Sequence, residues 1–101
     1  MYNLNDYQTA MNRTYKPNRI LNHILGLCGE AGETAELIKK DQYQSKPYDR
    51  NTMKEELGDV LWYLTALAQD HDLTLSEIAE RNAEKLTIRY PEGFVHGGGI
   101  R

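Results

Sequence analysis

Apolar residues recur every three to four positions along most of the chain, which is the period of an amphipathic helix. Leu4, Tyr7, Met11 and Tyr15 form the first such stripe and predict a helix over about 4–15. Pro17 then interrupts the pattern, because proline disfavours helical structure in the residue before it. A second helix is predicted over about 18–41, with the core stripe Ile20, Ile24, Leu27, Ala31, Ala35 and Ile38.

The second half of the chain repeats this organisation. Residues 42–50 are polar and aperiodic and include a proline, which predicts a loop. Thr52 and Glu55 have the spacing of a capping box and predict the start of a third helix, which ends near residues 71–72. Its apolar face is Met53, Leu57, Val60, Leu64, Leu67 and Ala68. Thr74 and Glu77 form a second capping box, which opens a fourth helix that runs to about residue 90.

These elements predict an all-α fold: a four-helix bundle-like arrangement in which short connections make neighbouring helices antiparallel. The chain shows no strand-like alternation and no internal repeat. A length of 101 residues indicates one domain over 1–101. The glycine-rich segment 93–101 is expected to be a flexible tail.

Composition narrows the classes of function. A net charge of −3 gives no basic surface for nucleic acid. No apolar run approaches the 18 or so residues of a membrane span, so no membrane partner is expected. The lone Cys28 excludes an intrachain disulfide, fits a cytoplasmic location and is expected to be a small core residue. Glycines and carboxylates inside the helices leave little core for so short a chain, which favours a homodimer or homotetramer.

Two pairs of carboxylates stand out on the predicted second and third helices. Glu30 and Glu33 are three residues apart, on one side of a helix, and Glu56 and Asp59 repeat the spacing. At roughly 100° per residue, both pairs fall on the shoulder of an apolar stripe rather than opposite it. Carboxylates beside a core need positive charge nearby.

Glycines accompany these pairs. Gly26, Gly29 and Gly32 lie within the second predicted helix, where each costs about 1 kcal/mol relative to alanine. Close approach of a neighbouring backbone or a ligand would explain them.

Solvated glutamates paired with lysines are the simpler interpretation of any one carboxylate, but two matched pairs favour a metal site. Oxygen ligands suit Mg²⁺, with Mn²⁺ as a possible substitute. A di-iron bundle would use Glu-x-x-His, which is absent here. Glu36 and Glu55 fall outside these sectors and are expected to be solvated.

The fourth predicted helix adds a polar group on the same face as Ile78, made of Asn82, Lys85 and Arg89. Long side chains at a core edge explain this pattern, because they keep their charged ends in water. Alternatively, the three residues face an anionic ligand. Beside magnesium carboxylates, such a ligand would contain phosphates.

The ordered set of motifs resembles the MazG-like all-α nucleoside triphosphate pyrophosphohydrolases over about residues 4–94. The matching segments are Leu-Asn-Asp-Tyr-Gln from Leu4, Glu30-Ala-Gly-Glu33, Glu56-Leu-Gly-Asp59 with Val-Leu-Trp-Tyr-Leu after it, and Asn-x-x-Lys-Leu-x-x-Arg-Tyr-Pro-Glu-Gly-Phe from Asn82. All four acidic positions of the family motif are present.

The resemblance implies Mg²⁺-dependent hydrolysis of a nucleoside triphosphate, by preference a deoxynucleotide, to the monophosphate and pyrophosphate. A metal-activated water would attack the α-phosphorus in a homo-oligomer. By similarity the metal ligands are Glu30, Glu33, Glu56 and Asp59.

We favour Glu33 as the group that orients or deprotonates the water. Lys85 and Arg89 would neutralise phosphate charge, and Tyr63 would donate to a phosphate. Asn82 would contact the sugar or the base. Trp62 would stack on a base, although a lone tryptophan is as often an interface residue.

Two alternatives remain open. One is an enzyme of the same fold that acts on phosphoribosyl-ATP, dUTP or dCTP. The other is a non-catalytic Mg²⁺-binding helical oligomer, which the intact set of ligands disfavours.

Overall fold

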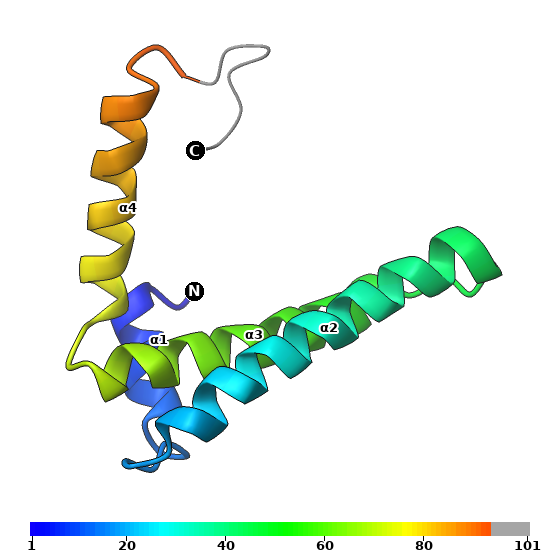
Figure 1. The fold of residues 1–101 in the computed structure, drawn as a ribbon, viewed down its shortest axis with the longest axis horizontal. Helices are drawn as coiled ribbons and strands as arrows, with labels where there is room; N and C mark the ends of the chain where they lie inside the picture. The colour runs from blue at the N-terminus through cyan, green and yellow to red at the C-terminus, as the bar shows by residue number, and fades with distance from the viewer. Residues whose placement is uncertain (94–101) are drawn as a thin grey trace.

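The computed structural model describes residues 1–93, and this part of the chain consists of four α-helices without strands. The helices are α1 (Leu4–Met11), α2 (Ile20–Gln44), α3 (Arg50–Asp70) and α4 (Leu75–Arg89). The predicted all-α, four-helix class is therefore confirmed. Figure 1 shows α2 and α3 running antiparallel along each other. The tail predicted for 93–101 lies outside the described residues except for Gly93.

Side-chain caps set where three of the helices begin. The predicted capping box of Thr74 and Glu77 is confirmed, because each side chain accepts from the other residue's backbone N–H, at 3.0 and 2.7 Å. The box predicted at Thr52 is wrong: α3 begins at Arg50, and Asp49 is its N-cap, accepting from Thr52 N–H at 2.7 Å. The Asp49 side chain pairs with a backbone N–H that would otherwise be free in the first turn, so α3 begins about one turn before the predicted start.

The first two helices also end at different places from those predicted. α1 stops at Met11, and hydrogen-bonded turns continue the chain to Tyr15. α2 extends to Gln44 and ends at Ser45, which has a left-handed backbone conformation with φ 53°. Lys46 N–H then donates to Lys40 O at 3.1 Å, which closes the last turn.

The contact between α2 and α3 lies on a different face of α2 from the predicted core stripe. The less exposed residues of α2 recur at helical spacing and are His23, Gly26, Leu27, Glu30, Thr34, Leu37 and Asp41. On α3, one set of less exposed residues recurs at the same spacing: Met53, Glu56, Val60, Tyr63, Leu67 and Asp70. Glu30 and Glu56 therefore belong to the faces that the two helices turn toward each other.

Much of the predicted apolar core is open in the single chain. On α2, Ile20, Ile24 and Ile38 are 40–49% exposed. On α3, Leu57 and Leu64 are 52% and 38% exposed. The buried apolar residues of the described chain are few, and two of the four are alanines: Met11, Ala66, Ala68 and Leu75. Cys28 is also exposed, so its expected place in the core is wrong for the single chain.

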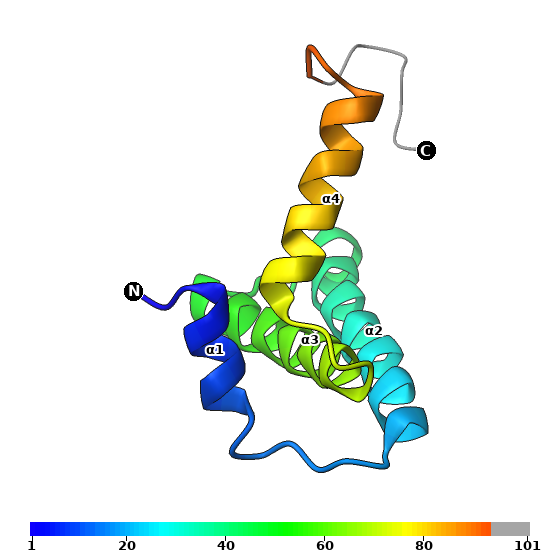
Figure 2. The same cartoon turned by 90° about the vertical axis from the view of Figure 1, so that its left-hand side faces the viewer.

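α1 joins the remaining elements. Gln69 Nε2 donates to Asn12 Oδ1 at 2.8 Å, which links α3 to the end of α1. Leu75 N–H donates to Gln8 Oε1 at 2.8 Å, which links α4 to α1. Beyond this junction α4 projects away from the α2–α3 pair (Figures 1 and 2), and its residues 77–89 are exposed. Within residues 1–93, no helix has an apolar stretch long enough to cross a membrane.

Candidate active site

Three carboxylates converge where α2 faces α3. Glu30 and Glu33 lie one turn apart on α2, and Glu56 approaches them from α3. Each of the three contributes a carboxylate oxygen, and these oxygens all lie within 4.8 Å of one another. We call this group the acidic cluster. It unites three of the four residues that the sequence predicts as metal ligands.

Two oxygens of the acidic cluster are buried without a hydrogen-bond partner. Glu30 Oε2 and Glu56 Oε2 are shielded from solvent and accept no hydrogen bond within the described chain. Leaving a buried acceptor unpaired costs stability, and more so when it is charged. Lysine pairing, the simpler interpretation of these glutamates, occurs instead at Glu36, whose carboxylate lies 3.9 Å from Lys39 Nζ.

The electrostatics of the acidic cluster are those of crowded negative charge. Burial raises the pKa of Glu30, and the charges of Glu33, Asp59 and Glu56 raise it further. Burial likewise raises the pKa of Glu56, followed by the charges of Glu33 and Asp59. A divalent cation would reverse both effects. An all-oxygen donor set with unpaired buried oxygens fits a hard cation such as Mg²⁺ or Mn²⁺.

Asp59 borders the acidic cluster from the next turn of α3. It lines a cavity of about 310 Å³ together with Glu30, Thr14, Trp62 and Tyr63. Burial and then the charge of Asp59 raise the pKa of Tyr7 on α1. The fourth predicted ligand therefore lies beside the cluster but outside its group of three close oxygens.

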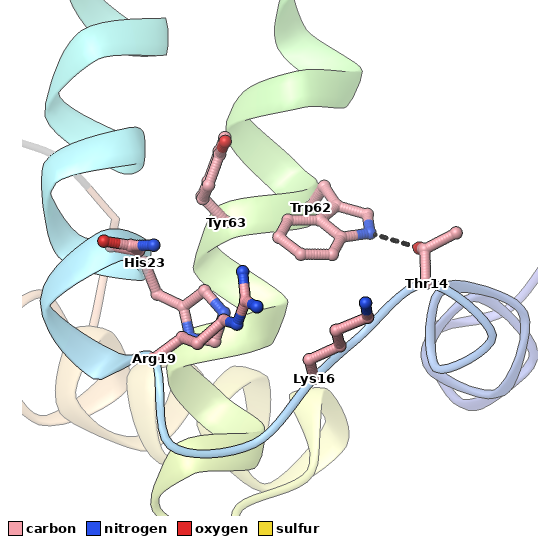
Figure 3. Close-up of a pocket in the computed structure, with 7 residues that line it drawn as sticks. Thr14, Lys16, Arg19, His23, Trp62 and Tyr63 are labelled. Carbon is pink, nitrogen blue, oxygen red and sulfur yellow. Dashed lines mark hydrogen bonds between the residues drawn. The ribbon is translucent and has the colours of Figure 1, made fainter.

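A second cavity, of about 250 Å³, adjoins the first. Its lining residues are Thr14, Lys16, Arg19, Asn22, His23, Trp62 and Tyr63 (Figure 3). Thr14, Trp62 and Tyr63 line both cavities, so the two spaces meet at these side chains. Trp62 is held in place because its Nε1–H donates to Thr14 Oγ1 at 2.9 Å, and its ring makes an edge contact with Tyr63 at 5.1 Å.

One of the three helical glycines is closely approached, by an aromatic side chain. A Cβ added to Gly26 would overlap the ring of Tyr63, so only glycine lets this ring pack on α2. Gly29 and Gly32 have nothing within 4 Å of an added Cβ. Within the described chain, a close approach thus occurs at Gly26 alone, and a side chain makes it rather than the backbone or ligand that was expected.

Comparison with known proteins decides the family. Residues 19–94 match the model of the MazG nucleotide pyrophosphohydrolase domain, which covers all the acidic residues above. The chain belongs to the MazG family. The predicted enzyme class, a nucleotide pyrophosphohydrolase, is confirmed with it.

Individual MazG relatives agree in sequence and in fold. The chain is 39% identical over 79 residues to the Gene 37 protein of Mycobacterium phage L5, a match that spans 74% of this chain and 69% of the phage protein. It is 35% identical over 86 residues, 79% of this chain, to dCTP pyrophosphatase 1 of Rattus norvegicus. The chain spans about half of that enzyme's length, 51%.

A solved structure agrees with the fold as well. This structure is YPJD of Bacillus subtilis, assigned as a pyrophosphatase, which matches with a TM-score of 0.67 and 30% identity over 84% of this chain and 95% of that one.

The substrate residues predicted for this MazG chain divide into two groups. Asn82, Lys85 and Arg89 are exposed on α4 and line neither of the two cavities. Tyr63 and Trp62, by contrast, line both. The roles predicted for all five residues stay predictions.

Sequence reasoning missed most of the second cavity. Lys16, Arg19 and Asn22 belong to the α1–α2 loop and the first turn of α2, where no periodic pattern marks them. Two basic residues on either side of Pro17 and Asn18 were the only available signal. His23 was unmarked because its partner, Asp70, is 47 residues away.

Proposed function

We propose that this MazG chain hydrolyses a nucleoside triphosphate, by preference a deoxynucleotide, to the monophosphate and pyrophosphate with Mg²⁺ in the acidic cluster. The principal support is the pair of buried, unpartnered carboxylate oxygens of Glu30 and Glu56, since Glu30 also lines an open cavity. The preference for a deoxynucleotide is supported by the 35% identity to a dCTP pyrophosphatase.

Glu30, Glu33 and Glu56 would hold the metal, together with Asp59. When bound, Mg²⁺ supplies positive charge for the triphosphate and makes a water molecule more acidic. Glu33 is the exposed member of the acidic cluster, so water reaches its carboxylate most easily, which supports its assignment as the proton acceptor.

Tyr63 and Trp62 would contact the substrate where the two cavities meet. The Tyr63 hydroxyl would donate to a phosphate oxygen. The indole N–H of Trp62 already donates to Thr14, so this side chain offers its ring surface for stacking on a base.

We also propose that the protein is a homodimer or homotetramer. On α2, the exposed apolar stripe is rotated by roughly a quarter-turn about the helix axis from the residues that face α3. On α3, the exposed apolar stripe is rotated by a similar angle, in the same direction, from the residues that face α2. Because the helices are antiparallel, both stripes open on the same side of the pair. The exposed members, including Ile24, Ile38, Leu57 and Leu64, therefore form one apolar face that a second copy would cover.

A second copy also gives α4 a role. Since Asn82, Lys85 and Arg89 line neither of the cavities described in their own chain, their predicted contacts with sugar and phosphate would be made in a neighbouring copy. A single domain over 1–101 and a cytoplasmic location stay predictions.

The test is a screen of all nucleoside and deoxynucleoside triphosphates with Mg²⁺, scored for pyrophosphate release. Phosphoribosyl-ATP is included as the alternative substrate. We expect release that stops on chelation and returns with Mg²⁺ or Mn²⁺. Activity that survives exhaustive chelation would exclude the metal site. Metal binding without release from any substrate would favour the non-catalytic alternative.

A further inference from the structure

The loop between α1 and α2 places two cations next to the proposed metal site. Lys16 and Arg19 line the 250 Å³ cavity, and Figure 3 shows both side chains extending from the loop toward the space beside Trp62. Neither forms an ion pair in residues 1–93, where the basic side chains that do are His23, Lys39 and Arg81. Two positive groups that line one cavity without a carboxylate favour an anionic occupant.

The position of this cavity relates it to the substrate. It meets the cavity of Glu30 and Asp59 at three shared residues, Thr14, Trp62 and Tyr63. A ligand held at the acidic cluster can therefore extend past the two aromatic rings and reach Lys16 and Arg19. The first cavity is lined by the carboxylates of Glu30 and Asp59, and the second by the cations of Lys16 and Arg19.

The segment that contains the cations is anchored at both ends. Tyr15 O–H donates to Asp70 Oδ1 at 2.7 Å, and His23 Nδ1 donates to Asp70 Oδ2 at 2.6 Å. The His23 and Asp70 side chains are each 4% exposed. Tyr15 precedes Lys16, and His23 lies one turn after Arg19, so α3 fixes the loop on either side of the cations. Such preorganisation lowers the entropic cost of binding a ligand.

We propose that Lys16 and Arg19 bind the terminal phosphates of the substrate, which leave as pyrophosphate. This inference rests on the proposed function. Ammonium and guanidinium groups form charge-assisted hydrogen bonds with phosphate oxygens, and the Asn22 amide is a further donor in the same cavity. A nucleobase, the other end of the substrate, carries no charge that would require two cations.

The experiment measures binding of the two products separately. Isothermal titration calorimetry with excess Mg²⁺ gives the dissociation constants of inorganic pyrophosphate and of dCMP for the full chain and its variants. Lys16→Gln with Arg19→Gln removes both charges, and we expect it to weaken pyrophosphate binding at least tenfold while dCMP binding changes less than twofold. Arg19→Lys keeps the charge and should retain most of the affinity.

Arg13→Gln is the matched control, because Arg13 is an exposed cation in the same connection but does not line the cavity. It should leave both constants unchanged. Thermal denaturation with and without Mg²⁺ shows that each variant is folded and still binds metal.

Unaltered pyrophosphate binding in the double variant, or a selective loss of dCMP binding, would overturn the inference and assign the cavity to the nucleoside. Failure of the proposed function is seen separately, as a wild-type chain that releases no pyrophosphate from any triphosphate.

Discussion

Glu30 and Glu56 each keep one carboxylate oxygen out of solvent without a hydrogen-bond donor. At the scale of the residue, this is the feature that distinguishes them from the other glutamates of the chain. Burial and the neighbouring negative charges both disfavour the charged form of these carboxylates, so ionising them without a bound metal lowers the stability of the fold. The same arrangement would bind a divalent cation strongly.

Glu56→Gln should therefore separate activity from stability. Mutating a residue that only supports a metal ligand typically lowers metal affinity or activity by about 10–100-fold. Mutating a ligand itself should therefore lower the rate of pyrophosphate release by about 100-fold or more. The melting temperature without metal should stay the same or rise, since one charge of the cluster is gone. Glu36→Gln is the control and should be nearly silent in both assays. Equal damage from Glu36→Gln and Glu33→Gln would refute the assignment of ligands.

Asp70 gives the fold a predictable dependence on pH. Burial alone would raise the pKa of Asp70, but the hydrogen bonds from His23 and Tyr15 and the charges of His23 and His71 outweigh it and lower the pKa from its ordinary value. A carboxyl group whose pKa is lowered in the folded state stabilises that state when the pH is above the group's ordinary pKa. This contribution is lost as the pH falls through the lowered pKa.

Asp70→Asn should consequently destabilise the protein by about 1–3 kcal/mol at pH 7, the cost of leaving buried partners poorly satisfied. The difference from wild type should shrink below about pH 4. Urea denaturation at several pH values measures it. A difference that is constant from pH 7 to pH 3 would contradict the role given to the ionised carboxylate. Asp72→Asn, at an exposed position near the end of α3, is the control.

At the scale of the element, α2 combines a structural requirement with a functional one. Its inner face must accept the Tyr63 ring at Gly26 and, one turn later, hold Glu30 against α3. α4 is different: it is capped at its start, docked on α1 by its first residues and exposed beyond them. Its polar residues consequently depend on what lies beyond the single chain.

Gly26→Ala tests the packing of α2. Alanine favours a helix by about 1 kcal/mol over glycine, but here its Cβ would displace Tyr63, and overpacking of this kind costs about 1–3 kcal/mol. We expect a less stable protein with weaker substrate binding. Gly29→Ala is the matched control, since its Cβ would meet open space within the chain, and it should leave stability equal or higher. The prediction fails if both variants gain stability alike in thermal denaturation.

At the scale of the whole molecule, the largest unsatisfied feature is the apolar face of the α2–α3 pair. Some of the residues that periodicity predicts as core form this face, including Ile24, Ile38, Leu57 and Leu64, and these are open in the single chain. Burying each such side chain is worth about 1.5–3 kcal/mol, so covering several would stabilise an assembly substantially.

Light scattering should show a dimer or tetramer at micromolar concentration. Ile38→Glu combined with Leu64→Glu places charges on both stripes and should produce monomers. Lys39→Glu, an exposed neighbour outside the apolar stripe, should leave the assembly intact. A wild-type protein that remains monomeric would contradict the proposed homo-oligomer.

The sequence by itself determined the helices and the chemistry on them. Helical periodicity is a local property, so it located all four helices. It did not fix their ends: Asp49 replaced Thr52 as the cap of α3, α1 stopped at Met11, and α2 continued to Gln44. The i, i+3 spacing placed Glu30 beside Glu33 for the same reason, because one turn of helix fixes it.

Only the tertiary structure decided which face of each helix is covered, and by what. An apolar stripe shows which residues should leave water, but it does not distinguish a neighbouring helix from a second copy. In this chain α3 covers the Glu30 face of α2, while the stripe through Ile24 stays open. The packing of the helices also produces the contact between Asp70 and His23, which are distant in the sequence, and the cavity lined by Lys16 and Arg19. Neither feature follows from a local sequence pattern.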